Sequence, residues 1–324
     1  MTMHRRPATH LGQVTIRPLE EQELPEATRI FRLAFGTFLG VPDPSMFWAD
    51  TEHVQTRWSA DPTRVFAAEA EGILVGSNVA TRWGSVGFFG PLTIRPDLWD
   101  QGIAQQLMEP VMACFDTWGV QHAGLFTFPH SPKHLHLYQK FGFFPRFLTF
   151  ILAKPVAPSK GTIELSLFSQ VADHERGELL RACAEVTGAI YEGLDARGEI
   201  QAIAKQQLGE TVLLWKGAKL VGLACCHCGA GTEAGTDTCY IKFGAVLPGS
   251  DAGQQFEQLL HACEALAVAQ GCARLVAGVN LGRPEAYHQV LAAGFRAQMV
   301  GVAMEKPNEP GYNRAGVYLI DDWR

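Results

Sequence analysis

Apolar residues recur along the N-terminal part of the chain with two periods, one typical of helices and one typical of strands. A short strand is predicted from Val14, and a helical period follows it with apolar residues at Leu24, Ala27, Ile30, Phe31, Ala34 and Phe35. Residues 46–58 predict a second helix, and residues 64–96 contain three strand-like runs broken by glycines. A helix from Gly102 to about Trp118, a strand, a short helix and a last strand complete this part.

The same order of elements returns in the C-terminal part. Residues 154–162 are rich in Pro, Ser and Gly, which is typical of a linker. Each side of this segment reads as strand, two helices, three strands, helix, strand, helix and strand. We therefore predict an internal duplication, with domains at 13–156 and 163–324 and a linker at about 155–162. The alternative is two α/β domains that merely share a common alternation.

Composition and charge narrow the class of protein. The chain has 324 residues, 47% of them hydrophobic and 19% charged, as in an ordinary globular protein. A formal net charge of -6 argues against nucleic acid as a partner, because no strong positive field attracts phosphates. The chain contains no apolar run long enough to cross a membrane, and its first residues lack the apolar core of a secretory signal. We expect a cytoplasmic protein that binds neither membrane nor nucleic acid.

Eight cysteines raise the question of a metal. Cys225, Cys226 and Cys228 lie in the run "CCHC", which contains a C-x-x-C spacing but lacks a second pair at the distance of a zinc ribbon. The same run reads as a strand of small buried residues, which is the interpretation we favour. His130, His134 and His136 also have no Cys, Asp or Glu nearby to complete a metal site. We therefore predict no metal, and keep a zinc protein as the alternative.

The start of the helix at Gly102 is a candidate anion site. The first N–H groups of a helix lack partners within the helix, and the helix dipole is positive there. Gly102 and Ala104, spaced G-x-A after a strand, keep side chains small where a phosphate would approach. Taken alone, G-x-A is a weak signal of phosphate binding and is more typical of a loop that enters a core helix.

Three segments together make the chain resemble the GNAT superfamily of acyl-CoA-dependent N-acyltransferases. They are the strand "FFGPLTIRP", the G-x-A turn and the later "LYQKFGFFPR". The resemblance implies an α/β (α+β) fold of two tandem GNAT-like domains, each with a mixed, mostly antiparallel sheet flanked by helices. It also implies acetyl-CoA as co-substrate.

The resemblance assigns cofactor-binding roles to particular residues. A central strand that splays from its neighbour would present Leu92, Thr93 and Ile94 to the pantetheine arm. The turn that follows would hold the pyrophosphate with Trp99, Asp100, Gln101, Gly102, Ile103 and Ala104. Trp99 departs from the Arg or Gln of the family pattern, and Asp100 adds a negative charge beside an anion. These departures predict weaker binding of the cofactor, with Gln101 as a substitute donor.

The same resemblance assigns the catalytic role to Tyr138. A phenol suits a general acid that protonates the thiolate of coenzyme A, because the two groups have similar pKa values. Ser131 falls where the family often has an Asn that contacts the cofactor arm. A proton acceptor for the amine is not identified, and Glu69, Glu71, Asp97 and His130 are all candidates.

The C-terminal part lacks these chemical elements. Val290 falls where Tyr138 stands in the first part, and the turn before the corresponding helix has Asp251 and no G-x-G/A. The simplest interpretation is a fold copy that no longer transfers acyl groups. A rival interpretation keeps an anionic ligand at Asn280, Arg283 and Tyr287.

We therefore predict an N-acetyltransferase that moves an acetyl group from acetyl-CoA to the primary amine of a small molecule or peptide, by direct attack in the N-terminal domain. The alternative is a non-catalytic acyl-CoA-binding or regulatory protein. The acceptor and the choice between monomer and homodimer remain open.

Overall fold

The computed structural model describes residues 12–156 and 165–324, so most of the predicted linker lies outside the described residues. The N-terminal half contains the strands β1 (Val14–Pro18), β2 (Val65–Ala70), β3 (Ile73–Trp83), β4 (Val86–Phe89), β5 (Thr93–Ile94), β6 (His122–Thr127) and β7 (Phe144–Pro155), and the helices α1 (Leu24–Leu39), α2 (Val54–Ala60), α3 (Ile103–Trp118) and α4 (Pro132–Gln139). Their order agrees with the pattern in the sequence.

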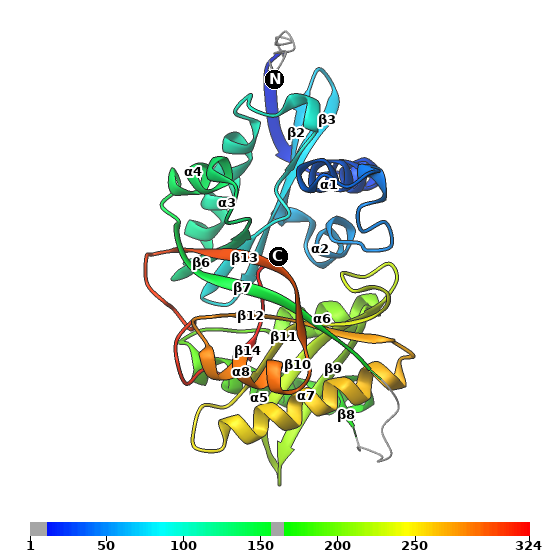
Figure 1. Cartoon of the computed structure of the whole chain (residues 1–324), viewed down its shortest axis with the longest axis vertical. Helices are drawn as coiled ribbons and strands as arrows, with labels where there is room; N and C mark the ends of the chain where they lie inside the picture. The colour runs from blue at the N-terminus through cyan, green and yellow to red at the C-terminus, as the bar shows by residue number, and fades with distance from the viewer. Residues whose placement is uncertain (1–11, 157–164) are drawn as a thin grey trace.

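The C-terminal half repeats that order, except that it has no counterpart of the two-residue strand β5 and ends with an additional two-residue strand. Its strands are β8 (Ser166–Leu167), β9 (Gly209–Lys216), β10 (Lys219–Gly229), β11 (Gly235–Val246), β12 (Arg274–Asn280), β13 (Arg296–Lys306) and β14 (Leu319–Ile320), and its helices are α5 (Asp173–Ile190), α6 (Arg197–Gln206), α7 (Ala252–Ala269) and α8 (Pro284–Ala292). The two halves lie one above the other along the longest axis of the molecule (Figure 1). The mixed, mostly antiparallel sheet flanked by helices confirms the predicted fold class.

One sheet runs through both halves, and the halves exchange a strand where they meet. The strand order is β1-β2-β3-β4-β6-β13-β7-β12-β11-β10-β9-β8. β13 of the C-terminal half therefore lies between β6 and β7, while β7 of the N-terminal half lies between β13 and β12. Figure 1 shows β7 and β13 crossing the middle of the molecule. Each half thus receives one strand of its sheet from the other.

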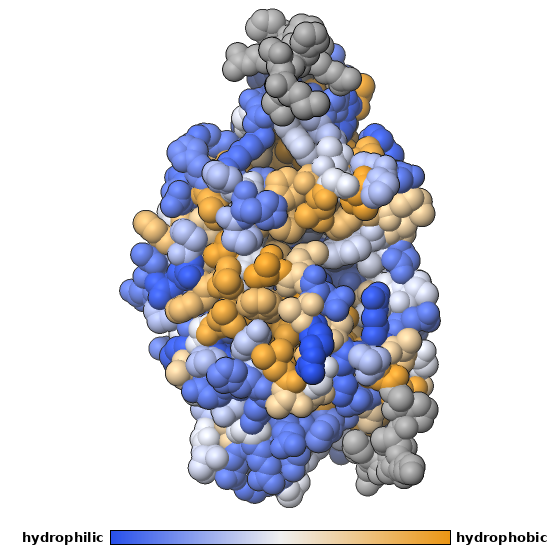
Figure 2. Space-filling view, viewed as in Figure 1, coloured by the Kyte–Doolittle hydropathy of each residue, from blue (hydrophilic) through white to orange (hydrophobic). Residues whose placement is uncertain are grey.

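The exchanged strands also form part of the surface. Apolar residues gather in the middle of the face in Figure 2, over the region where Figure 1 shows β7 and β13. Phe144 and Leu148 of β7 and Val300 of β13 are among the exposed large apolar side chains. In the core beneath, Trp83 of β3 packs edge-on against Phe243 of β11, at 5.0 Å between ring centroids. The two halves therefore share a hydrophobic core.

β4 and β6 part in the N-terminal half. They pair in parallel from Val86 to Phe88, opposite His122 to Gly124. Beyond that point the chain leaves β6, and β5 pairs with β3 instead. Gly76 of β3 permits this close approach, because a Cβ there would lie 2.5 Å from the Thr93 carbonyl oxygen. A gap therefore opens between the two strands, as the GNAT resemblance implies.

β11 and β12 part in the C-terminal half at the corresponding place. They pair in parallel only from Thr238 to Ile241, opposite Arg274 to Ala277. Just beyond this stretch, β14 pairs with β11 at Gly244 and Ala245 and contacts β12. β14 therefore fills the gap that remains open in the N-terminal half.

The predicted helix at 46–58 is wrong over its first part, because α2 begins only at Val54. The residues before it form an irregular loop in which Phe47 and Trp48 stack at 4.7 Å and Trp48 has a φ of 44°. These aromatic rings pack on α1 instead of following a helical period. Among the described residues, no helix is long and apolar enough to cross a membrane.

Candidate active site

Two cavities meet at the gap between β4 and β6. The larger, of about 490 Å³, lies between β5, the start of α3 and α4. The smaller, of about 110 Å³, lies between the end of β4, β6, α1 and the loop before α2. Four residues line both cavities: Phe35, Leu92, His134 and Tyr138. The gap therefore connects the larger cavity with the smaller one.

The larger cavity brings together most of the residues to which the sequence assigned the cofactor. Those that line it are Leu92, Ile94, Trp99, Asp100, Gln101, Gly102, Ile103, Ala104, Ser131 and Tyr138. Thr93 is outside this set, because its hydroxyl faces β3 and lies 3.3 Å from Ser77 Oγ. Leu92 and Ile94 therefore face the cavity, while Thr93 between them faces the sheet, as the alternation of a strand requires.

The start of α3 presents free backbone donors to this cavity. Gly102 precedes the helix with a φ of 78°, in the left-handed region that favours glycine, and no side chain caps the helix. The first backbone hydrogen bond of the helix runs from Gln106 N to the Gly102 carbonyl, at 3.3 Å. The amides of Ile103 and Ala104 therefore precede the first intrahelical bond and can bind an anion.

Trp99 and Asp100, the two departures from the family pattern, both have partners. The indole Nε1 of Trp99 donates to the Ile94 carbonyl at 2.9 Å, which ties the turn to β5. Lys133 of α4 forms an ion pair with Asp100 and lies 5.8 Å from the centroid of the Trp99 ring. Lys133 thus offsets the charge of Asp100 at the rim of the cavity. Sequence reasoning missed it, because Lys133 is on a different helix from the turn.

Tyr138 is buried where the cavities meet, with its ring 5.6 Å from that of Phe89. Burial raises its pKa well above the usual range, and a hydrogen bond with the Thr127 side chain opposes this only in part. The phenol is therefore protonated at neutral pH. A buried, protonated hydroxyl between two cavities can donate a proton to a group in either one.

His134 is the histidine that lines both cavities. Burial lowers its pKa, and the nearby Lys133 charge lowers it further. Its backbone N–H donates to Ser131 Oγ at 3.4 Å, so that Ser131 caps α4. His130, the histidine among the four candidates from the sequence, packs its ring on Phe38 at 5.6 Å. His134 carried no distinguishing signal in the sequence beyond its place on the helix of Tyr138.

Two of the carboxylates considered as proton acceptors are bound elsewhere. Glu69 pairs with Arg17 at 2.8 Å, and Asp97 pairs with Arg95 at 2.6 Å. Neither lines the two cavities. Glu71 lies in the tight turn between β2 and β3, with a φ of 55°, and is also outside them. Each of these carboxylates is therefore far less suited to proton transfer than His134.

Residues of the C-terminal half close the smaller cavity. Met299, Trp323 and Arg324 line it together with aromatic side chains of α1 and the following loop. The Trp323 ring lies against Gly124 of β6, which has no side chain to obstruct it. This contact was not predictable from the sequence, because it joins residues that are far apart along the chain.

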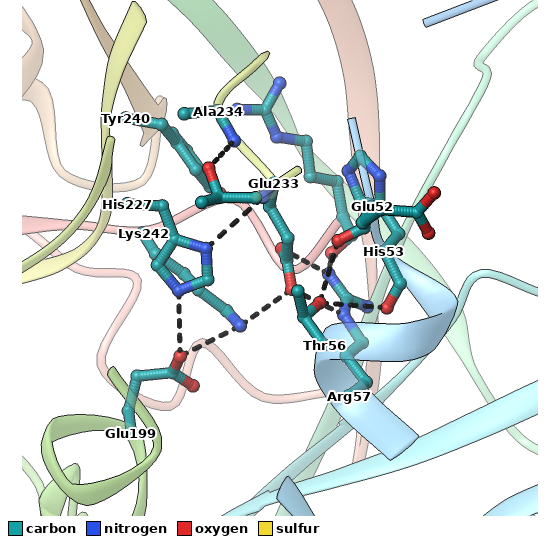
Figure 3. A network of polar contacts seen from close by, with 12 residues as sticks. Glu52, His53, Thr56, Arg57, Glu199, His227, Glu233, Ala234, Tyr240 and Lys242 are labelled. Atoms are coloured by element: carbon teal, nitrogen blue, oxygen red, sulfur yellow. Dashed lines mark hydrogen bonds and ion pairs between the residues drawn. The ribbon is translucent and has the colours of Figure 1, made fainter. Parts of the chain in front are cut away.

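A buried ionic network joins the two halves beside this cavity (Figure 3). Arg57 of α2 forms two hydrogen bonds with Glu233 of the β10–β11 loop, at 2.8 and 2.9 Å. Lys242 of β11 contacts both Glu233 and Glu199 of α6, each at 2.9 Å. Arg57 Nη1 also donates to the Gly90 carbonyl at 2.6 Å, at the end of β4. The network thus fixes the strand end where the gap opens.

The carboxylates of this network are ionised. Burial opposes ionisation, but Lys242 and His227 lower the pKa of Glu199 to about 2. Arg57 and Lys242 likewise hold the pKa of Glu233 well below its usual range, against the effect of burial. Two cations therefore compensate two buried anions across the boundary between the halves.

Two of the polar residues proposed for a second anion site in the C-terminal half have partners within the fold. Asn280 donates to Thr149 Oγ1 at 3.0 Å, and Arg283 contacts Asp321 Oδ1 at 2.6 Å. Val290, the counterpart of Tyr138, is buried in the core. All eight cysteines are free, and no three His, Cys, Asp or Glu side chains within residues 12–156 and 165–324 could hold a metal together.

Comparison with known proteins agrees with this architecture. Residues 27–143 match the model of the acetyltransferase (GNAT) family. A candidate acetyltransferase of Pyrococcus horikoshii is similar over 99% of both chains, with a TM-score of 0.68 and 12% identity. A GCN5-related N-acetyltransferase of Sphaerobacter thermophilus is similar over 90% of this chain and 95% of its own, with a TM-score of 0.57 and 13% identity. No curated protein matches the sequence.

Residues 27–143 are therefore similar to the acetyltransferase (GNAT) family, and the whole chain shares its fold with these two solved structures. The resemblance stated from the sequence is confirmed at this level. The structural similarity extends beyond the matched domain to the whole chain.

Proposed function

We propose that the protein is an N-acetyltransferase that uses acetyl-CoA to acetylate a primary amine. The observation that supports this most is the meeting of two cavities at Leu92 and Tyr138, in the gap between β4 and β6. Acetyl-CoA would occupy the larger cavity and the amine the smaller one. The thioester would then lie beside Leu92 and Tyr138, which are two of the four residues that line both cavities.

The start of α3 would bind the pyrophosphate of the cofactor. The amides of Ile103 and Ala104 supply donors, and Lys133 supplies a positive charge at the same rim. The pantetheine arm would lie along Leu92 and Ile94 of the strand that leaves β6. Leu92 N–H makes no backbone hydrogen bond within the described residues, so it is free to polarise the thioester carbonyl.

The reaction would proceed by direct attack. The neutral amine forms a C–N bond with the thioester carbonyl carbon, and the tetrahedral intermediate then breaks its C–S bond. Tyr138 donates its phenolic proton to the departing thiolate, and the surplus proton of the amine passes to His134 directly or through water. His134 is suited to accept it because its lowered pKa leaves the imidazole uncharged at neutral pH.

We assign this chemistry to a domain at 13–156 and a supporting role to a domain at 163–324. The C-terminal half would close the amine cavity through Met299 and Trp323 and hold Gly90 through the Glu233–Arg57 pair. A cytoplasmic location, expected from the sequence, belongs to the same proposal.

Two measurements test the proposal. Calorimetry should detect acetyl-CoA binding at micromolar concentration, and a thiol reagent should detect free coenzyme A when a primary amine is added. No binding at high micromolar acetyl-CoA would contradict the proposal. Binding without turnover on any amine of a broad panel would instead favour a non-catalytic acyl-CoA-binding protein.

A further inference from the structure

We propose that the acceptor is a small aromatic amine: a primary amine joined to an uncharged aromatic ring that carries a hydrogen-bonding group. This inference rests on the proposed acetyl transfer and concerns the smaller cavity. Three features of that cavity support it, namely its walls, its charge and one buried histidine.

The walls of the cavity are largely aromatic. Phe31, Phe35, Phe47, Trp48, Phe128 and Tyr138 all line it. Several of these rings stand nearly parallel in a row: Phe35 and Phe47 lie 6.0 Å apart at 18°, and Phe47 and Trp48 lie 4.7 Å apart at 20°. Aromatic faces of this kind favour a further flat ring, which stacks or meets an edge without loss of contact.

The charge of the cavity disfavours polycationic acceptors. No Asp or Glu side chain lines it within the described part of the chain, and its one permanently charged side chain is the cation Arg324. Burial lowers the pKa of His53 to about 3, so this residue stays uncharged. A polyamine or an aminoglycoside would bring several positive charges to a cavity that no described Asp or Glu side chain lines. An aromatic monoamine carries a single ammonium, which it loses before attack.

His53 provides the polar contact that the rest of the cavity lacks. Its ring is 4% exposed and is held between Phe31 at 5.1 Å and Trp48 at 5.4 Å. Neither ring nitrogen has a hydrogen-bond partner among residues 12–156 and 165–324. Buried nitrogens without partners are unfavourable, and a hydroxyl or ring N–H on the acceptor would satisfy one of them. His53 would thereby select a ring that carries such a group.

The closure of the cavity limits the size of the acceptor. Trp323 of the C-terminal half is 4% exposed and stands against β6, with its Nε1 donating to Tyr312 Oη at 2.8 Å. The cavity measures about 110 Å³ on the acceptor side of Tyr138. A single ring with a short aminoalkyl arm fits such a space better than the end of a peptide does.

Four amines test the inference with the full chain: tyramine, 2-phenylethylamine, n-hexylamine and spermidine. We expect kcat/KM to fall in that order, with tyramine favoured over hexylamine by about tenfold or more. Spermidine should be the poorest substrate. Equal or better turnover of spermidine or hexylamine would overturn the inference while leaving acetyl transfer established. No turnover on any amine, together with no acetyl-CoA binding, would instead overturn the proposed function.

Variants locate the preference in the cavity. His53→Phe keeps an aromatic ring of similar size and should remove most of the advantage of tyramine over 2-phenylethylamine, about tenfold. Trp48→Ala should raise KM for both aromatic amines about tenfold while leaving the acetyl-CoA dissociation constant unchanged. The matched control is Trp215→Ala, an exposed tryptophan of β9, which should alter neither constant. An unchanged tyramine preference in a His53→Phe protein that still binds acetyl-CoA would refute the role of His53.

Discussion

The two halves of the molecule share one order of elements and differ at the place where two parallel strands part. In the N-terminal half the gap between β4 and β6 opens onto two cavities, with Tyr138 between them. In the C-terminal half, β14 pairs with β11 at the corresponding place, and Val290 replaces the tyrosine in a closed core. The same backbone arrangement therefore leaves two joined cavities in one half and a filled gap in the other.

This difference shows that a fold and its site are separable. The C-terminal half retains the sheet and helices, because these depend on apolar periods that tolerate many side chains. It has no corresponding cavity pair, because β14 occupies the gap and Val290 stands in the core where the N-terminal half has Tyr138. The C-terminal half nevertheless contacts the N-terminal half, through the Arg57–Glu233 pair and through Trp323.

The largest effect should come from the residue that the halves do not share. Tyr138→Phe removes the proposed proton donor and should lower kcat by about 10²–10⁴-fold, with acetyl-CoA affinity nearly unchanged. The matched change in the other half is Tyr287→Phe, whose ring packs on Phe150 at 5.4 Å. It should leave kcat unaltered. Equal rates for wild type and Tyr138→Phe would remove Tyr138 from the mechanism.

The second largest effect should come from the buried ion pairs that join the two halves, and it should fall on stability. Glu233→Gln leaves Arg57 and Lys242 buried without one anion, so we expect the free energy of unfolding to fall by about 3–5 kcal/mol. The control is Glu26→Gln, which breaks an exposed pair with Arg29 and should change stability by less than about 1 kcal/mol. Denaturant unfolding measures both. Equal losses would show that the buried network does not stabilise the joined halves.

The same network predicts a loss of stability in acid. The pKa of Glu199 is lowered to about 2 from an ordinary value of 4.5, and that of Glu233 is lowered as well. A lowered pKa stabilises the fold above the unfolded value, and this contribution disappears as the pH falls from about 4.5 towards 2. We expect the free energy of unfolding, measured against pH, to decline less in the Glu233→Gln protein than in wild type over that pH range.

A smaller effect is expected where the C-terminal half closes the amine cavity. Gly124→Ala places a methyl group against the Trp323 ring, which should cost about 1–3 kcal/mol of stability and displace the ring. We expect KM for the amine to rise several-fold while acetyl-CoA affinity is retained. Gly188→Ala in α5 has free space around it and serves as the control. If the Gly124→Ala protein is destabilised but its KM for the amine is unchanged, Trp323 does not contribute to acceptor binding.

The smallest effect concerns two matched lysines. Lys133 pairs with Asp100 before α3, and Lys216 pairs with Asp251 before α7. Lys133→Ala should weaken acetyl-CoA binding by about 2–5-fold, since a surface charge contributes roughly 0.2–1 kcal/mol, and less at high salt. Lys216→Ala should not alter binding. Calorimetry at low and high salt tests both variants, and equal effects would exclude a specific contact of Lys133 with the cofactor.

The sequence predicted the order of elements because local apolar periods determine helices and strands. It also located the start of α3 at Gly102, where a left-handed φ favours glycine. It failed in the loop before α2, where Phe47 and Trp48 follow no period because they pack on α1. The sequence also did not predict the roles of Lys133, His134 and His53. Each role depends on contacts that form only in the folded chain. The position of β13 between β6 and β7 could not be predicted either, since periodicity does not specify which strands pair.

The position of β13 has a consequence for how the protein is made. β6 ends at Thr127 and its neighbour β13 begins at Arg296, so the ribosome must add about 170 residues before the sheet of the N-terminal half can close. At about 5–20 residues per second, that interval lasts roughly 10–35 seconds. During this time the edge of β6 has no native partner. Closure of the sheet around the two cavities therefore waits for the synthesis of β13, and the nascent chain is a natural client for chaperones that shield open strand edges.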